Sequence, residues 1–97
     1  EKVTNALFTT LNQDENVNVR LAALEVLKRY SKSSEVRAQL IESIAFQDSP
    51  LVQIAMAELM VTIQEKKSVD ALKQLLQNEN TPKEIKTKIS ESIKVLI

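Results

Sequence analysis

The sequence predicts an all-α fold, an α-α superhelix in which three helical hairpins stack into a short solenoid. Three observations lead to this prediction: apolar residues recur at helical spacing, the composition disfavours tight turns, and a pattern of 33 residues repeats along the chain. Apolar residues three and four positions apart place one side of an amphipathic helix against a core. The absence of Gly argues against β-hairpins and for helices joined by short polar loops.

Six amphipathic segments account for most of the chain. The expected helices cover residues 2–12, 17–30, 35–46, 50–64, 69–77 and 82–96. Val3, Leu7 and Leu11 form the expected apolar side of the first helix, because side chains four residues apart lie on one side of a helix. Glu65, beside two lysines, is expected to be a solvated charge.

Polar residues that favour helix starts precede several of these segments. Asn16 and Ser49 are the expected N-caps of the second and fourth helices, since their side-chain oxygens can accept hydrogen bonds from free backbone N–H groups. Thr81 is expected to begin the last helix through a capping box with Glu84, with Pro82 at the first helical position.

The internal repeat sets the organisation of the chain. Residues 3–30 align without a gap on residues 36–63, and Glu25, Glu58 and Glu91 occupy one repeat position in all three copies. A period of this length indicates a helical solenoid. The 97 residues therefore form a single domain. Its repeats cover about residues 3–33, 36–66 and 69–97.

The segment 14–27, with Asp14, then Val19 and Arg20, then small and aliphatic residues, resembles the HEAT-repeat signature. The resemblance implies a right-handed solenoid whose second helices line the inner, concave face. It also implies a structural role for Asp14, Arg20 and Asp48, with Arg20 bonded to Asp14 or to an inter-repeat loop. The alternative is that Arg20 binds an anionic partner. The second copy departs from the signature, because Gln53 replaces the arginine.

The segments 16–25 and 47–55 are also similar to the C-terminal helical region of bacterial membrane-anchored anti-sigma-type proteins. This resemblance implies an accessory or sensing module of envelope signalling, tethered to the inner membrane by an upstream segment. A zinc-binding domain and a membrane span would lie in that segment, together with any inhibition of a sigma factor. The first residue is Glu1 rather than Met, and we expect a fragment of a longer protein.

The composition excludes several classes of function. The absence of His, Cys and Gly argues against a metal site, a cofactor site with a phosphate loop, and a hydrolase, so we expect no catalytic residues. Lys plus Arg and Asp plus Glu number 13 each, which argues against nucleic acid as a partner. No apolar run approaches the ~20 residues of a membrane span, so this segment should not insert into a bilayer.

The second helix of each hairpin carries two apolar stripes. One stripe should face the first helix of the same hairpin and consists of Val19, Ala23, Leu27 and Tyr30. The other contains Val17, Leu21 and Leu24, and the second copy repeats it with Ile54, Ala57 and Val61. In the third copy the positions become Thr87, Ser90 and Lys94, which is typical of a terminal cap. Left uncovered, the stripe with Val17 favours a homo-oligomer formed through the N-terminal repeat.

A polar line between these stripes is the candidate binding surface for a protein partner. It contains Glu25, Arg29, Leu51, Glu58, Thr62 and Glu91. The recurring glutamates predict a basic partner, although a solvated face explains the same residues. The sequence therefore predicts a non-catalytic protein–protein interaction module. The alternatives are a structural spacer or self-association domain and, less favoured by the charge, a nucleic-acid-binding domain.

Overall fold

The computed structural model describes residues 1–97 and contains six α-helices, one short 3-10 helix and no β-strand. The elements are α1 (Lys2–Gln13), α2 (Val17–Lys28), α3 (Ser34–Ile44), α4 (Pro50–Thr62), η1 (Lys66–Ser68), α5 (Val69–Leu76) and α6 (Lys83–Leu96). Each expected helix is present, and its ends coincide with the expected ends or differ from them by one or two residues. The prediction of an all-α fold is confirmed.

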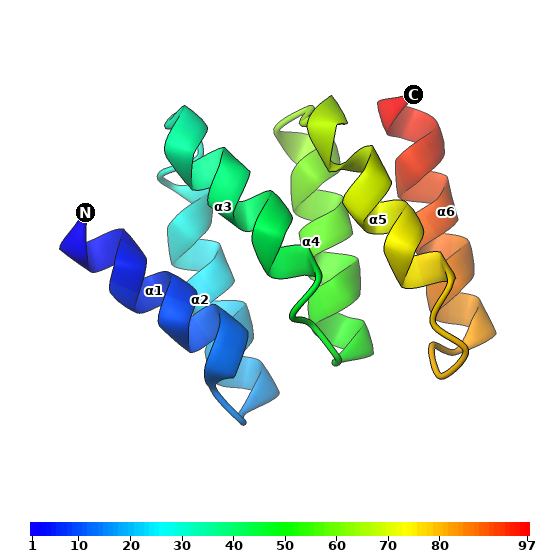
Figure 1. Cartoon of the computed structure of the whole chain (residues 1–97), viewed down its shortest axis with the longest axis horizontal. Coiled ribbons are helices and arrows are strands. Elements are labelled where there is room, and N and C mark those ends of the chain that lie inside the picture. Colours follow the sequence, from blue (N-terminus) through cyan, green and yellow to red (C-terminus); the bar gives the residue numbers. More distant parts are fainter.

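The helices form two layers, and consecutive helices run antiparallel (Figure 1). The first helices of the hairpins, α1, α3 and α5, lie in one layer, and the second helices, α2, α4 and α6, lie in the other. The hairpins follow one another along the longest dimension of a molecule that measures 36 × 28 × 16 Å. Because α2 packs on α4 and α4 packs on α6, the layer of second helices is continuous from one end of the chain to the other.

The helix starts follow local cap chemistry in one case and depart from it in another. The Asn16 side chain accepts hydrogen bonds from the N–H groups of Asn18 and Val19, at 2.8 and 3.3 Å, so the expected cap of α2 is confirmed. The expected capping box at Thr81 is wrong. Pro82 adopts an extended backbone with ψ 148° and is itself the N-cap, so α6 begins at Lys83 and no side chain caps it. Thr81 therefore precedes the N-cap, and its side chain forms no capping bond.

The end of α4 is a tight turn built without glycine. Gln64 has a φ of 55°, in the left-handed region that costs residues with a Cβ free energy. The Glu65 N–H donates to the Met60 carbonyl at 2.9 Å, and the Gln64 N–H donates to the Val61 carbonyl at 3.1 Å. These two bonds are the Schellman arrangement that satisfies the last carbonyls of a helix. The turn directs the chain from α4 into η1 and α5.

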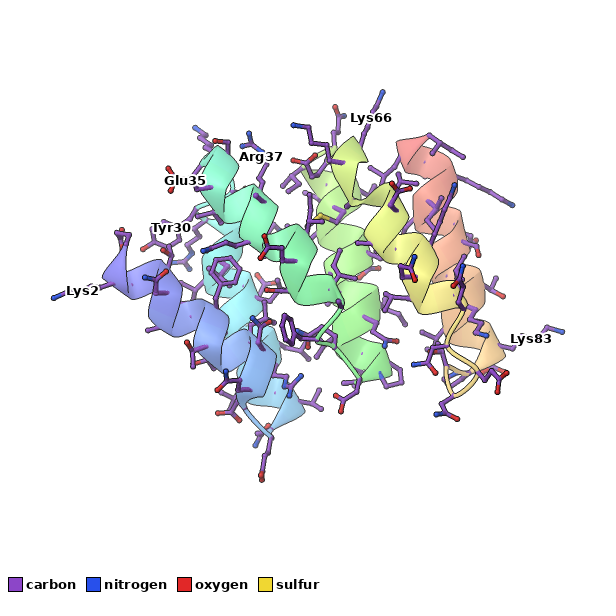
Figure 2. The ribbon with its side chains drawn as sticks, in the orientation of Figure 1. Lys2, Tyr30, Glu35, Arg37, Lys66 and Lys83 are labelled. Atoms are coloured by element: carbon purple, nitrogen blue, oxygen red, sulfur yellow. The ribbon has the colours of Figure 1, made fainter.

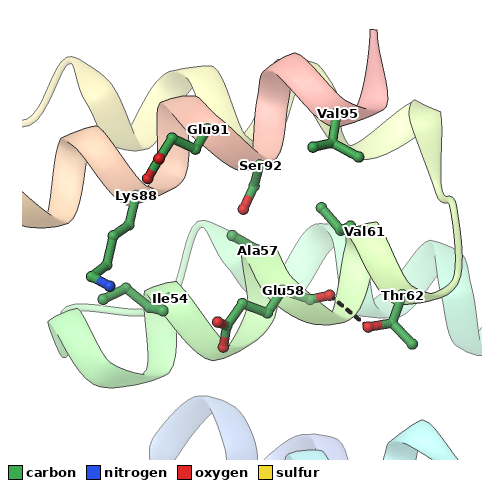
Figure 3. A pocket seen from close by; sticks show the side chains of 9 residues that line it. All are labelled: Ile54, Ala57, Glu58, Val61, Thr62, Lys88, Glu91, Ser92 and Val95. Carbon is green, nitrogen blue, oxygen red and sulfur yellow. Dashed lines mark hydrogen bonds between the residues drawn. The ribbon is translucent and has the colours of Figure 1, made fainter.

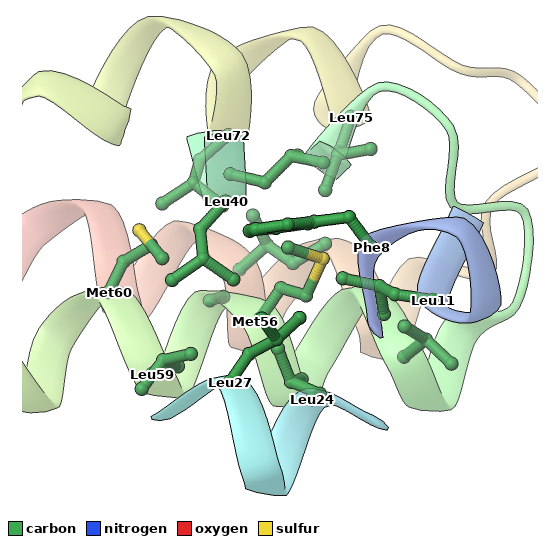
Figure 4. Close-up of a cluster of buried hydrophobic side chains, with 14 of the residues drawn as sticks. Phe8, Leu11, Leu24, Leu27, Leu40, Met56, Leu59, Met60, Leu72 and Leu75 are labelled. Atoms are coloured by element: carbon green, nitrogen blue, oxygen red, sulfur yellow. The ribbon is translucent and has the colours of Figure 1, made fainter. Parts of the chain in front are cut away.

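The core runs between the two layers and is mainly aliphatic (Figure 4). Leu27 and Met60, which occupy the same repeat position, are fully buried. The expected apolar side of the first helix is partly wrong, since Val3 is 53% exposed whereas Phe8 is buried. The physical reason is that α1 packs on α3 as well as on α2. Phe8 lies on the side that α3 covers, and Val3 lies toward the end of the array.

Two predictions about the second helices also need correction. In the first stripe, Ala23 and Leu27 are buried, but Val19 and Tyr30 remain 39% and 37% exposed. The stripe with Leu21 and Leu24 does not form an open end of the array, because both residues line the space between α2 and α4. This stripe therefore lies between repeats and is not the uncovered end face that the prediction of a homo-oligomer assumed.

Candidate functional site

Two grooves open between neighbouring second helices. The first lies between α2 and α4, has a volume of about 540 Å³, and is lined by Leu21, Leu24, Glu25, Lys28, Ala55, Glu58, Leu59 and Thr62. The second lies between α4 and α6, has a volume of about 450 Å³, and is lined by Ile54, Ala57, Glu58, Val61, Thr62, Lys88, Glu91, Ser92 and Val95 (Figure 3). We call them the α2–α4 groove and the α4–α6 groove.

The two grooves are copies of one another. Each of the eight residues of the α2–α4 groove, moved by 33 positions, falls on a residue of the α4–α6 groove, and Thr62 is the single additional residue. Glu58 and Thr62 line both grooves, because α4 supplies one wall of each. The internal repeat of the sequence thus produces a repeated surface.

The grooves combine an apolar floor with a charged rim. Leu24 and Leu59 are 5% exposed and lie in the floor of the α2–α4 groove, and Ala57 takes the equivalent position in the α4–α6 groove. The rim of each groove carries two glutamates and one lysine. In the α4–α6 groove, the Lys88 side chain extends from α6 toward Ile54 of α4 (Figure 3). Each groove therefore combines apolar side chains with paired carboxylates and one amine.

The structure unites four of the six residues on the predicted polar line. Glu25, Glu58, Thr62 and Glu91 line the grooves, and all four are exposed. Arg29 and Leu51 are exposed as well but line neither groove, since Arg29 is the C-cap of α2 and Leu51 lies in the first turn of α4. The spacing of residues along a helix predicts which side of that helix they share. A residue lines a groove only if a neighbouring helix also passes beside it.

Several groove residues were absent from the predicted line. Lys28, Ala55 and Leu59 line the α2–α4 groove, and Lys88 and Ser92 line its copy. The 33-residue repeat could have identified them, because Ala55 and Leu59 in the second copy align with Lys88 and Ser92 in the third. The last groove has therefore exchanged two apolar wall residues for polar ones.

Arg20 lies at the boundary between the first and second hairpins. Its Nε donates to the Asp14 backbone carbonyl, and its Nη1 donates to Gln47 Oε1 at 3.0 Å. The same guanidinium lies 3.8 Å from the exposed Asp48 carboxylate. The Asp14 carboxylate instead accepts from the Asn16 N–H at 2.8 Å. These contacts hold two inter-helix loops together, and they leave Arg20 mostly buried rather than presented to a partner.

Gln47 connects the same two loops and was not identified from the sequence. Its side chain is buried, and its Nε2 donates to the backbone carbonyls of Leu11 at 3.3 Å and Ser43 at 3.1 Å. Gln53 Nε2 donates to the Gln47 carbonyl at 2.8 Å, which repeats the bond from Arg20 to the Asp14 carbonyl one period later. The repeat alignment could have indicated this contact, because Gln47 aligns with Asp14 and Gln53 aligns with Arg20.

A second polar link, through Arg37 of α3, connects the loop before α3 to the turn after α4 at the opposite edge of the layers. Arg37 Nε lies 3.2 Å from Glu65 Oε1, and Arg37 Nη1 donates to the carbonyls of Ser31 and Lys32 at 2.8 Å each. Arg37 and Lys66, the neighbour of Glu65, both lie at this edge (Figure 2). The expectation of a solvated Glu65 is wrong, since its side chain is only 13% exposed.

The remaining chemistry of the surface is limited. No cluster of three or more His, Cys, Asp or Glu side chains is arranged to hold a metal ion. None of the helices combines the length and the apolar character that crossing a bilayer requires.

A family model described as HEAT repeats matches residues 4–94 of the chain. Comparison with curated proteins and with solved structures found no match. The match spans all three hairpins and includes every residue that lines the two grooves except Val95.

Proposed function

The chain belongs to the HEAT-repeat family, and we propose that it is a non-catalytic protein–protein interaction module that binds its partner across the two grooves. The observation that carries the proposal is the duplication of one groove at the period of the repeat, with Glu58 and Thr62 shared between the copies. A partner that spans α4 can therefore use the same recognition chemistry twice. Repetition of a weak contact is the way in which solenoids build an extended binding surface.

The groove chemistry supports a partner segment that is both apolar and basic. Apolar side chains of such a segment would contact the half-buried Leu21 and Ile54 and the exposed Val95 in the walls. Its lysines or arginines would pair with Glu25, Glu58 and Glu91 on the rims. Neighbouring packed helices lie ~8–10 Å apart. A helical partner rises about 1.5 Å per residue, so its basic residues should recur about every five to seven residues.

The narrower role is that of an accessory or sensing domain in bacterial envelope signalling. Its support is the similarity of the segments 16–25 and 47–55 to the helical region of anti-sigma-type proteins. On this proposal, the grooves would bind a signalling partner, and the sigma-factor-binding chemistry would belong to another part of the polypeptide.

The proposal is tested by selecting peptides that bind the domain. A library of displayed peptides is selected on the immobilised chain, and the enriched peptides are titrated while amide chemical shifts are recorded. We expect the peptides to be enriched in Lys, Arg and aliphatic residues, and the shifts to concentrate on α4 near Glu58 and Thr62. Added salt should weaken binding, because exposed charges are screened over ~8–10 Å.

Two triple variants test whether the glutamates on the groove rims contribute to partner binding. Glu25→Lys, Glu58→Lys and Glu91→Lys together should slow association about ten-fold or more, through lost electrostatic attraction. The matched control reverses three other exposed glutamates, Glu15, Glu42 and Glu79, which line neither groove. The control variant has the same net charge as the groove variant. Equal binding by the two triple variants, or shifts confined to α1, α3 and α5, would contradict the proposal.

A further inference from the structure

The lysines of the two grooves lie on opposite sides of the glutamate row. In the α2–α4 groove, Lys28 follows Glu25 by three residues. In the α4–α6 groove, Lys88 instead precedes Glu91 by three residues. Three residues shift a side chain by about 4.5 Å along a helix, and α2, α4 and α6 all run in the same direction. Lys28 is therefore displaced from the glutamates toward the C-terminal ends of these helices, and Lys88 toward their N-terminal ends.

Neither groove lysine forms an ion pair within the chain. The ion pairs of the structure involve Arg20 and Arg37. Lys88 could pair with Glu91, since residues three apart on a helix are neighbours. Its side chain instead crosses the groove toward Ile54, and its amine has no carboxylate partner (Figure 3). All the charged side chains on the two rims are exposed, so both their carboxylates and their amines can meet a partner.

The two lysines change the kind of partner that the glutamates alone would select. Together, the grooves carry three carboxylates and two amines. A segment with lysine or arginine at every polar position would bring like charges to Lys28 and Lys88, which weakens binding. A partner carboxylate at each of these two points would be attracted instead. The charge pattern therefore disfavours a uniformly basic segment.

The charge pattern is the same when it is read from either end of the array. In projection, a half-turn about Glu58 exchanges Glu25 with Glu91. The same half-turn exchanges Lys28 with Lys88, because each lysine lies on the wall of its groove that is farther from α4, and the two lie on opposite sides of the glutamates. A complementary partner therefore has acidic residues on opposite sides of its basic row, one near each end.

We propose that the partner is an amphipathic segment of this mixed charge, and that Lys28 and Lys88 select it over a polybasic one. Its basic residues pair with the glutamates of the rims. One of its acidic residues pairs with Lys28, and the other pairs with Lys88. The inference rests on the proposed function, because both lysines line the grooves that the partner would occupy.

Peptide selection on three forms of the chain tests the inference. The probe is a displayed library of random peptides of about 20 residues, which as helices are about 30 Å long and can span three neighbouring helices. It is selected on the wild-type chain, on Lys88→Glu and on Lys94→Glu. Lys94 is the matched control, since it is exposed on the same helix and lines neither groove. Circular dichroism checks that both variants are folded.

The selected sequences should differ in the sign of one charge. Peptides from the wild-type chain and from Lys94→Glu should contain Asp or Glu in addition to their basic residues. Peptides from Lys88→Glu should carry Lys or Arg where the acidic residue near α6 would stand, because the reversed charge at position 88 repels a carboxylate.

A double-mutant cycle then measures the contact itself. The acidic residue of a wild-type-selected peptide is changed to Gln, and Lys88 is changed to Gln, singly and together. Each single change should weaken binding about three-fold or more, and the double change should add little, because either change removes the same ion pair. The same cycle with Lys94→Gln should show that the two changes act independently.

Two results would overturn the inference and leave the proposed function standing. They are peptides that occupy both grooves without acidic residues, and identical selections on Lys88→Glu and Lys94→Glu. In both cases the peptides would still bind through the glutamates. Peptides whose amide shifts lie away from α4 would overturn the inference and the proposed function together.

Discussion

Arg20 Nη1 and Gln47 Oε1 meet at 3.0 Å across the boundary between the first two hairpins. Because Gln47 is buried and also donates to the Leu11 and Ser43 carbonyls, it satisfies polar groups from three helices and their loops. The apolar core alone does not specify how one hairpin sits on the next. This polar contact helps to fix the orientation of one hairpin on the next, since hydrogen bonds depend on geometry far more than apolar contacts do.

Removal of the Gln47 side chain should destabilise the domain. Gln47→Ala leaves part of the Arg20 guanidinium and the Leu11 carbonyl without a partner, at a cost of about 1–3 kcal/mol, whereas the Ser43 carbonyl keeps its bond from the Phe46 N–H. Urea unfolding followed by circular dichroism measures the change. Gln74→Ala, at an exposed position of α5, is the control and should cost less than about 0.5 kcal/mol. Equal costs for the two variants would mean that the Gln47 contacts do not contribute to stability.

The ion pair between Arg37 and Glu65 should show measurable coupling. In a double-mutant cycle with Arg37→Gln and Glu65→Gln, we expect a coupling free energy of about 1 kcal/mol, the upper end for such pairs. The reason is that the Glu65 side chain is only 13% exposed, so solvent screens the pair weakly. A cycle that combines Arg29→Gln with Glu65→Gln should be additive within about 0.5 kcal/mol. Additivity in both cycles would argue against the pair.

Substitutions that leave cavities at Leu27 and Met60 should lower the free energy of unfolding more than a substitution on the outer side of α6. Leu27→Ala and Met60→Ala should each cost about 2–5 kcal/mol, because both side chains are fully buried and leave voids between the layers. Ser90→Ala should cost less than about 0.5 kcal/mol, since no neighbouring helix packs on the outer side of α6. Thermal unfolding measures all three, and similar melting shifts would refute the packing described for α6.

Glycine at the turn after α4 should stabilise the protein. Gln64→Gly removes the Cβ from a residue with φ 55°, and we expect a gain of about 0.5–1 kcal/mol after the greater freedom of glycine in the unfolded chain is subtracted. Gln77→Gly provides the contrast. Gln77 ends α5 with φ −86°, where glycine gives no steric relief, so this change should destabilise by a similar amount. The two variants should therefore shift the urea midpoint in opposite directions.

The sequence by itself was sufficient for the six helices and their order. Apolar spacing and the cap at Asn16 are local properties, and they act in a segment whatever its neighbours are. The 33-residue repeat also placed Glu25, Glu58 and Glu91 on one face before any contact was known. Even so, the start of α6 was misplaced by one residue, because the extended backbone of Pro82 outweighed the capping box expected at Thr81.

Only the tertiary structure decided which side of each helix is covered. Phe8 rather than Val3 is buried because α3 lies on that side of α1, and Leu21 with Leu24 meets α4 instead of forming a free surface. The contacts of Arg20 with Gln47 and of Arg37 with Glu65 join residues that are 27 and 28 positions apart in the sequence. Helical periodicity orients a side chain about its own axis, but it carries no information about which neighbour stands there. That choice was made by the stacking of one hairpin on the next.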